Sequence, residues 1–311
     1  MNIIDKSFKD LVTTINSQTK EEIFNHIKKS YQKVPEETKN SLEKFLTNFP
    51  YWGQLHRNEG NYEEFYNRTI SLKEHLNDYI WLYDHLEDYR SKKLLYAILS
   101  NWYSFDFKNL STAIEKNYPH YFDLDLVKCN ENEIFVDIGA YTGDTVLEYL
   151  DNYGFENYKK IYCYEITDNS FKILQNNLKY YPNIIFRQKA ISDSTLNLFI
   201  DTNKTDSSAN KINFIGTNEI ETTTIDCDIK EKVTLIKMDI EGGEEKALLG
   251  CENHIKNDHP KLLISVYHNH EDLFKIPLLI NNFNPNYKFY LRNYGNCIFP
   301  TETVLIAIPK K

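Results

Sequence analysis

Hydrophobic and polar residues follow two different periods along the chain, and the change occurs near Cys129. Over the first ~120 residues, apolar side chains recur every three or four positions, as they do on the buried face of an amphipathic helix. The segment Ser71–Asp88 shows this spacing most clearly, and Ser71 with Glu74 forms a capping-box pattern at its start. Further helices are predicted over Glu21–Tyr31, Pro35–Phe49 and Ser91–Tyr103. The first part of the chain is therefore predicted to be all-helical.

After Cys129, short apolar runs typical of strands alternate with helical patterns. The predicted strands are Ile134–Asp137, Lys160–Tyr164, Ile184–Ala190, Val233–Met238, Lys261–Val266, Tyr287–Leu291 and Val304–Ile308. The predicted helices are Asp144–Asp151, Asp168–Lys179, Glu244–Cys251 and Glu271–Asn282. Alternating strands and helices indicate right-handed crossovers and a mostly parallel sheet that is covered on both faces. The second part is thus predicted to be α/β.

We therefore predict two domains, a helical one over residues 1–125 and an α/β one over residues 126–311. The helical domain carries no chemical motif, so we expect it to cover a substrate pocket of the α/β domain as a lid or to form a surface for a homodimer. Within the α/β domain, the polar segment Leu196–Thr224 interrupts the alternation with Ser207, Ser208 and Gly216. Such a segment predicts a hairpin or a loop near the ligand.

Composition narrows the class of protein. The 311 residues are 41% hydrophobic and 26% charged, which is ordinary for a globular chain with a sizeable core. Lys and Arg total 36 against 45 Asp and Glu, so the net charge of -9 disfavours a nucleic acid as the partner. The chain start has no leader pattern, and no apolar run is long enough to span a membrane, so we expect a cytoplasmic location. Five cysteines without a C-x-x-C pair predict reduced thiols.

The stretch Phe135–Thr145 combines a strand end, a turn with two glycines and a helix start, a geometry that brings a ligand against backbone amides. A dinucleotide fingerprint would need glycines where Tyr141 and Asp144 stand, and the Gly-Lys-Ser/Thr of a Walker loop is absent. Asp137 and Asp144 flank the turn and would repel a pyrophosphate. Two acids suit a ligand with an ammonium and a sulfonium group, so we predict S-adenosylmethionine.

A second expected element of this site is Glu165, which ends the next predicted strand. It follows the turn at a distance where an acidic side chain can accept hydrogen bonds from both hydroxyls of an adenosine ribose. Taken alone, Glu165 could equally be a solvated carboxylate before a helix. Together with the turn, it favours the ligand-binding interpretation.

Several motifs resemble, in family order, the FkbM family of S-adenosylmethionine-dependent methyltransferases. The main ones are Phe135–Thr145, Glu165, Thr222–Asp226 and Ile236–Glu244. Further matches are Ala190–Asp193, Leu248–Gly250, Tyr267–His268, Glu302–Thr303 and, before the first strand, Tyr121–Asp123. The resemblance covers about residues 121 to 311. It implies a Rossmann-like class I methyltransferase sheet, here preceded by an all-helical N-terminal domain.

The resemblance also implies which residues bind the donor. They are Asp137, Gly139, Ala140, Tyr141, Thr142, Gly143, Asp144, Thr145, Glu165, Ile166 and Ala190. The chain departs from the family pattern at Gln188 and Lys189, where an asparagine-valine pair is common, and at Gly243, where alanine is frequent. Family members found among bacterial surface-sugar genes imply an acceptor hydroxyl on a sugar, a nucleotide sugar or a glycolipid precursor, in polysaccharide biosynthesis.

An alcohol acceptor must lose a proton as it attacks the methyl group, so we expect a base at the ligand-facing edge of the sheet. Asp239 and His268 are the candidates, and Glu241 is expected to hold the acceptor or to orient a partner. A purely structural role is the alternative for each: Asp239 can cap the turn that follows it, and His268 can make a structural hydrogen bond. Asp226, Asp239, Glu241, His268 and His270 would also suit a divalent cation, but no ligand spacing demands one.

Two other functional classes stay open. A non-catalytic module that binds S-adenosylmethionine or a nucleotide would keep the turn and Glu165 without needing Asp239, Glu241 and His268. A methyltransferase of a nucleic acid, or of another acceptor that is not a sugar, would share the donor-binding fold. The acidic balance of the chain and its lack of a basic stripe favour a small acceptor over a nucleic acid.

Overall fold

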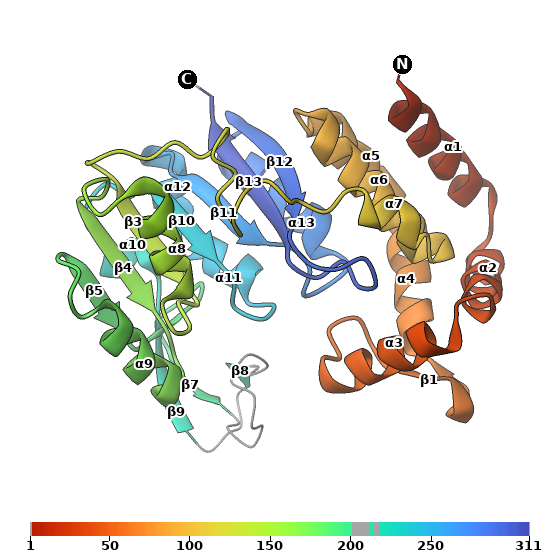
Figure 1. Cartoon of the computed structure of the whole chain (residues 1–311), viewed down its shortest axis with the longest axis horizontal. Helices are drawn as coiled ribbons and strands as arrows, with labels where there is room; N and C mark the ends of the chain where they lie inside the picture. Colours follow the sequence, from red (N-terminus) through yellow and green to blue (C-terminus); the bar gives the residue numbers. More distant parts are fainter. Residues whose placement is uncertain (1, 201–211, 214–217, 311) are drawn as a thin grey trace. The chain divides into compact units, whose positions relative to one another are not determined.

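The computed structural model describes residues 2–200, 212–213 and 218–310 (Figure 1). The chain divides into two compact units. The first holds the residues up to Lys116 together with Val266–Pro277 and Phe289–Leu305; the second holds Asn117–Ser265, Leu278–Lys288 and the residues from Ile306 onwards. From Val266 onwards, the chain thus alternates between the units. The division into domains 1–125 and 126–311 stays a prediction.

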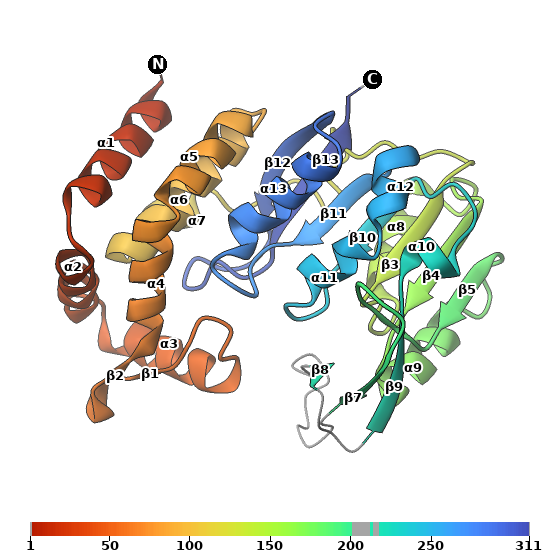
Figure 2. The same ribbon diagram turned by 180° about the vertical axis from the view of Figure 1, so that it is seen from behind.

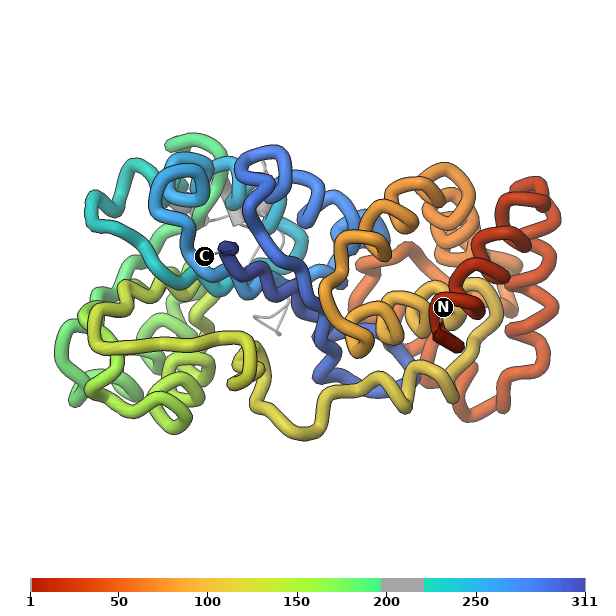
Figure 3. Tube along the Cα trace, turned by 90° about the horizontal axis from the view of Figure 1, so that it is seen from above, coloured from red at the N-terminus to blue at the C-terminus, as the bar shows by residue number. Residues whose placement is uncertain are grey.

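Amphipathic helices form most of the first unit, and Figure 3 traces them from red to yellow. They are α1 (Ile3–Ser17), α2 (Lys20–Gln32), α3 (Glu36–Asn48), α4 (Glu63–Glu74), α5 (Leu76–His85), α6 (Tyr89–Ser104) and α7 (Phe107–Ser111). Each buries residues at helical spacing, as Ile23, Ile27 and Tyr31 show on α2. A short antiparallel pair, β1 (Leu55–His56) with β2 (Asn61–Tyr62), and the turn η1 (Arg57–Glu59) interrupt the helices.

Three of the four predicted helices in this unit are confirmed, as α2, α3 and α6. The fourth prediction, one helix beginning at Ser71, is wrong, because α4 already runs from Glu63 and α5 starts after a break at His75. Phe65, Thr69 and Leu72 are buried on one face of α4 and carry the helix past Ser71. The Ser71 hydroxyl lies 2.6 Å from the hydroxyl of Tyr79 and does not cap a helix.

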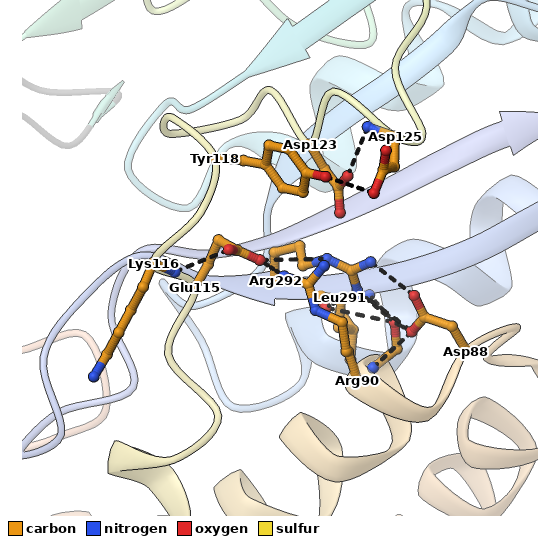
Figure 4. Close-up of polar contacts among 10 residues, drawn as sticks. Asp88, Arg90, Glu115, Lys116, Tyr118, Asp123, Asp125, Leu291 and Arg292 are labelled. Carbon is orange, nitrogen blue, oxygen red and sulfur yellow. Dashed lines mark hydrogen bonds and ion pairs between the residues drawn. The ribbon is translucent and has the colours of Figure 1, made fainter.

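The start of α6 is tied to strand β12 (Tyr287–Asn293) by ionic groups of the first unit, of which Arg292 and Glu115 are buried (Figure 4). Asp88 caps α6 and lies 2.7 Å from the guanidinium of Arg292, which also approaches Glu115 at 3.9 Å. Arg90 pairs with Glu115. Burial alone would raise the pKa of Asp88, but hydrogen bonds from Arg292 and Ser91 lower it.

A seven-stranded sheet forms the core of the α/β part, in the order β12-β13-β11-β10-β3-β4-β5. Its other strands are β3 (Ile134–Ile138), β4 (Lys160–Tyr164), β5 (Ile184–Arg187), β10 (Leu235–Met238), β11 (Lys261–Ser265) and β13 (Thr303–Pro309). The pairs β11·β10, β10·β3, β3·β4 and β4·β5 are all parallel. This arrangement confirms the predicted mostly parallel, Rossmann-like sheet.

Helices of the second unit cover both faces of this sheet. The crossover helices α8 (Asp144–Tyr153) and α9 (Asp168–Leu178) lie toward the viewer in Figure 1. Figure 2 brings forward α10 (Ile225–Asp228), α11 (Glu244–Leu249) and α12 (Glu252–Asn257). Helix α13 (Asp272–Phe283) precedes β12 in the chain. The predicted helix Glu244–Cys251 is confirmed as α11, but the chain then turns at Gly250 and begins α12, a helix the pattern did not indicate.

A smaller sheet follows in the order β6-β9-β7-β8, made of β6 (Ala190–Ile191), β7 (Asn197–Ile200), β8 (Ile212–Asn213) and β9 (Asn218–Thr223). β7 and β9 pair antiparallel, which agrees with the hairpin predicted over Leu196–Thr224. Ser207, Ser208 and Gly216, on which that prediction also drew, lie outside the described residues.

All five cysteines lie in the described ranges and are free thiols, as predicted. None of the helices in those ranges combines the length and the apolar character that crossing a membrane requires.

Candidate active site

The predicted ligand-binding turn lies between β3 and α8 and is held by backbone hydrogen bonds. The amides of Gly139 and Ala140 both donate to the carbonyl of Tyr164, at 3.0 and 2.9 Å, and the amide of Gly143 donates to the carbonyl of Ala140 at 2.7 Å. Gly139 has φ 78°, and a Cβ there would lie 1.9 Å from the carbonyl oxygen of Asp239. Only glycine fits at this close approach between the turn and the end of β10.

Glu165 follows β4 and holds the same turn from the side. Its buried carboxylate accepts hydrogen bonds from the amide of Tyr141 at 3.0 Å and from the amide of Thr167 at 2.7 Å. Burial raises the pKa of Glu165 although these amides oppose the shift. Each carboxylate oxygen has two lone pairs, so the group can accept ligand hydroxyls as well. The sequence predicted the ligand contact, but the bond to the turn is a finding of the structure.

The remaining predicted donor residues gather at the carboxyl ends of three neighbouring parallel strands. The turn follows β3, Glu165 and the half-buried Ile166 follow β4, and Ala190 comes three residues after β5. In the turn itself, the side chain of Tyr141 is 47% exposed and its φ is 45°. The carbonyl of Thr142 accepts a hydrogen bond from the side-chain amide of Asn177. Asp144 is exposed at the start of α8, and Thr145 is buried. Their contacts with a donor stay predictions.

Asp137 is fully buried on β3 and faces a lysine that the sequence reading gave no role. Lys237 stands opposite Asp137 in the parallel register, and its ammonium lies 3.1 Å from the carboxylate. The same ammonium donates to the carbonyl of Gly139 at 2.7 Å. Burial opposes the charge on Lys237, but Asp137, Asp239 and Asp144 together raise its pKa. Lys237 therefore stabilises both the buried acid and the turn that is predicted to bind the ligand.

Burial raises the pKa of Asp137 from 3.8 to about 6, against the opposing charge of Lys237. Folding therefore favours the protonated acid, and the contribution of Asp137 to stability is lost as pH rises from about 4 to about 6. We expect the melting temperature of Asp137→Asn, relative to that of the native protein, to increase over this pH range and then to level off. Calorimetry at half-unit steps of pH measures the difference. A difference independent of pH would contradict the raised pKa.

Asp239 directly follows β10, and its amide donates to the carbonyl of Ile138 at 3.0 Å, next to the ligand-binding turn. Its carboxylate accepts a hydrogen bond from the hydroxyl of Tyr121 at 2.6 Å. Tyr121 lies 118 residues earlier in the chain, before β3. The half-buried Asp239 therefore stands where the ends of β3 and β10 meet, at the edge of the sheet that carries the residues predicted to bind the donor.

Glu241 lies in the turn between β10 and α11. It is half-buried and adopts a left-handed backbone conformation, with φ 58°. The buried Glu244, at the start of α11, accepts a hydrogen bond from the amide of Ile240 at 2.8 Å. This bond closes the turn that presents Asp239 and Glu241. The predicted role of Glu241 toward the acceptor stays a prediction.

His268 belongs to the first unit and comes three residues after the end of β11. It is 1% exposed, and its ring lies 5.2 Å from that of Tyr51 and 4.1 Å from that of Tyr267. Its predicted role as a base stays a prediction.

Two further residues that the sequence offered as metal donors have other partners. Asp226 accepts from the amides of Asn253 and His254 at 2.9 and 3.1 Å and so caps α12. His270 is buried in the first unit, 3.9 Å from Glu64, and burial keeps its pKa well below the usual value.

The sequence reading missed the roles of Lys237 and Tyr121. For Lys237 a signal existed, because it lies inside the predicted apolar strand Val233–Met238 and a lysine is almost never fully buried unless it is paired. For Tyr121 no local pattern could have indicated the contact, since only the tertiary fold brings it to Asp239.

Comparison with solved structures shows a likeness in fold. A methyltransferase FkbM from Methylobacillus flagellatus matches with a TM-score of 0.66 and 24% identity, over 77% of this chain and 61% of that one. This chain therefore spans less than two thirds of the length of that relative. Two others are more distant. An rRNA methylase from Streptococcus thermophilus has a TM-score of 0.37 and 14% identity, over 58% of this chain and 89% of that one. Fibrillarin from Aeropyrum pernix with bound S-adenosyl-L-methionine has a TM-score of 0.38 and 11% identity, over 57% of this chain and 66% of that one.

Among curated proteins none matches the sequence. A family model does: the methyltransferase FkbM domain matches residues 137–296, just over half of the chain. The match begins at Asp137 and includes the ligand-binding turn, Glu165, Asp239 and Glu241. The chain therefore belongs to the FkbM methyltransferase family.

Proposed function

We propose that the protein is an S-adenosylmethionine-dependent O-methyltransferase that acts in the cytoplasm on a hydroxyl of a small carbohydrate acceptor, such as a sugar or a nucleotide sugar used for surface polysaccharide. One observation carries the proposal. A glycine turn, an acid after the next strand and a second acid after the strand on the other side stand at one edge of the parallel sheet. In open α/β sheets, ligands bind at this edge.

The residues at this edge fit the proposed donor. Glu165 is buried and already oriented by two amides, so it can accept the ribose hydroxyls without reorganising. The turn from Gly139 to Gly143 keeps this carboxylate in place, since the amide of Tyr141 donates to it. Asp144 lies exposed beside it and adds negative charge that favours a cationic ligand over a pyrophosphate.

When bound, S-adenosylmethionine supplies a methyl carbon that carries a good leaving group, the positively charged sulfur. The chain has to align an acceptor hydroxyl with that carbon and to remove the hydroxyl proton. Asp239 can take the proton, because its carboxylate stands at the same sheet edge as the donor-binding turn. Alignment supplies much of the rate in such a displacement, and Glu241 and His268 are the further residues proposed to act on the acceptor.

A carbohydrate is favoured over a nucleic acid by the charge of the chain. The formal charge of -9 would oppose binding to a phosphate backbone. The acidic groups at the proposed site, Asp144, Asp239 and Glu241, can instead accept hydrogen bonds from neutral hydroxyls.

The test is incubation with isotopically labelled S-adenosylmethionine and three groups of acceptors: nucleotide-activated sugars, free sugars and ribosomal RNA. Mass spectrometry then locates the label. Label on a sugar oxygen supports the proposal, label on RNA overturns the acceptor class, and donor binding without transfer to any acceptor favours a non-catalytic module.

The donor assignment can be tested without an acceptor. We expect Glu165→Gln to weaken the binding of S-adenosylmethionine about tenfold, because an amide replaces the charged acceptor of the ribose hydroxyls. Titration calorimetry measures the affinity. Glu231→Gln is the matched control, since Glu231 pairs with Lys160 at the opposite end of β4. Equal affinity of Glu165→Gln and the native protein would remove Glu165 from the donor site.

A further inference from the structure

We propose that Tyr121 is a positioning residue for the reaction: its hydroxyl fixes the carboxylate of Asp239 in the orientation in which that carboxylate takes the acceptor proton. The inference rests on the proposed O-methyl transfer and deepens it. Tyr121 is argued to act through Asp239 and not to touch the reacting atoms.

The geometry brings the Tyr121 hydroxyl to two strand ends at once. The hydroxyl donates to Oδ2 of Asp239 at 2.6 Å and lies 3.3 Å from Oγ of Ser265. Asp239 follows β10, Ser265 is the last residue of β11, and these strands are neighbours in the sheet. A phenol that donates to a carboxylate forms a short, charge-assisted bond, about twice as strong as a neutral one. Tyr121 therefore restrains Asp239 more firmly than a neutral hydrogen bond would.

The backbone of Tyr121 is strained, and strain of this kind concentrates at functional sites. Its φ is 68°, a left-handed conformation that is unfavourable for a bulky side chain. Contacts on several sides hold Tyr121 in this conformation. The ring is 4% exposed, stacks on the ring of His120 at 4.0 Å, and has the ammonium of Lys237 5.3 Å from its centre. The chain thus keeps a tyrosine in a conformation that asparagine or glycine would adopt more easily.

The proton balance explains why the orientation of Asp239 matters. As the acceptor oxygen forms its bond to the methyl carbon, the electron pair of the carbon–sulfur bond goes to sulfur, which becomes a neutral thioether. The acceptor O–H bond breaks at the same time, and the proton passes to the carboxylate of Asp239. Proton transfer requires hydrogen-bond geometry between donor and acceptor atoms. The hydrogen bond to Oδ2 restrains rotation of the carboxylate, so Oδ1 stays in line with the acceptor hydroxyl.

The first test compares Tyr121→Phe with Tyr118→Phe. Tyr118 also donates its hydroxyl to an aspartate, Asp125, three residues earlier in the same segment, so its removal costs a similar bond away from Asp239 (Figure 4). We expect Tyr121→Phe to lower kcat about tenfold or more, with KM for both substrates within about twofold of the native value. Tyr118→Phe should leave kcat unchanged. An unchanged kcat in Tyr121→Phe overturns the inference.

A double variant separates positioning from a general structural effect. If Tyr121 acts only through Asp239, adding Tyr121→Phe to Asp239→Asn should lower kcat no further. Effects that multiply in the double variant would show that Tyr121 acts independently, and the inference fails.

A second measurement needs no acceptor and no folded Tyr121 variant. In protein labelled with 13C at the tyrosine ζ carbon, the Tyr121 resonance should shift in Asp239→Asn and stay in place in Asp226→Asn. If Asp239→Asn leaves the Tyr121 resonance in place, the hydrogen bond to Asp239 is absent and the inference is wrong, even if the enzyme is active. If it shifts but the native protein methylates no hydroxyl, the proposed O-methyl transfer has failed and Tyr121 holds Asp239 for another purpose.

Discussion

Asp239→Asn should lose about 10²–10⁴-fold in kcat while it keeps its affinity for S-adenosylmethionine, because the amide cannot take the acceptor proton. The substitution preserves the size of the side chain and leaves the backbone in place. The amide of residue 239 still donates its hydrogen bond to the carbonyl of Ile138, and its carbonyl still lies beside Gly139. Steady-state kinetics with the acceptor found in the labelling experiment measure kcat, and calorimetry measures donor affinity. A variant that binds donor normally but does not transfer the methyl group would assign Asp239 to chemistry.

Two further variants make this result specific. Asp226→Asn removes an equivalent carboxylate that caps α12, so it should lower stability and leave kcat unchanged. His268→Ala tests the other candidate base. If His268→Ala loses turnover and Asp239→Asn retains it, the base is His268. If both retain it, neither residue is the base.

The sequence predicted the α/β elements well because each combines several local signals. β3 and β4 are continuous apolar runs followed by a turn or a helix start, and both were predicted within one residue of their bounds. The helical part was harder. α1 was missed although Asn2 and Asp5 form a capping box, and the break at His75 has neither glycine nor proline to indicate it. Such boundaries depend on tertiary packing, which a local pattern does not contain.

The candidate site shows the same difference. Gly139 and Glu165 were predicted because the chemistry of the ligand-binding turn requires a glycine and an acid at fixed places along the chain. Tyr121 could not be paired with Asp239, because no spacing links residues 118 apart. Lys237 lies within the motif Ile236–Glu244, but the motif indicates no role for it. A buried lysine needs a buried acid, but the register that supplies Asp137 becomes visible only in the sheet.

That register leads to the second large effect, in Lys237→Met. Asp137 is fully buried, and without the ammonium its charge has no opposite charge in contact. Removing one partner of a buried ion pair costs about 3–5 kcal/mol, so we expect the free energy of unfolding at pH 7.5 to fall by about that amount. Urea titration measures it. Lys160→Met is the control: Lys160 pairs with Glu231 where solvent screens the charges, so its loss should lower the free energy of unfolding far less.

The pH dependence and a double variant show whether this loss comes from the unpaired charge. Lys237 lowers the pKa of Asp137, so its removal raises that pKa, and the folded variant should bind a proton more readily than the native protein. Its deficit in stability should therefore shrink as pH falls from about 7 toward about 5. Asp137→Leu added to Lys237→Met removes the second charge and should regain most of the stability. The carbonyl of Gly139 would lack its donor in both variants, so both should bind S-adenosylmethionine more weakly than the native protein does. A double variant as unstable as Lys237→Met would mean that the ammonium acts through the turn and not through Asp137.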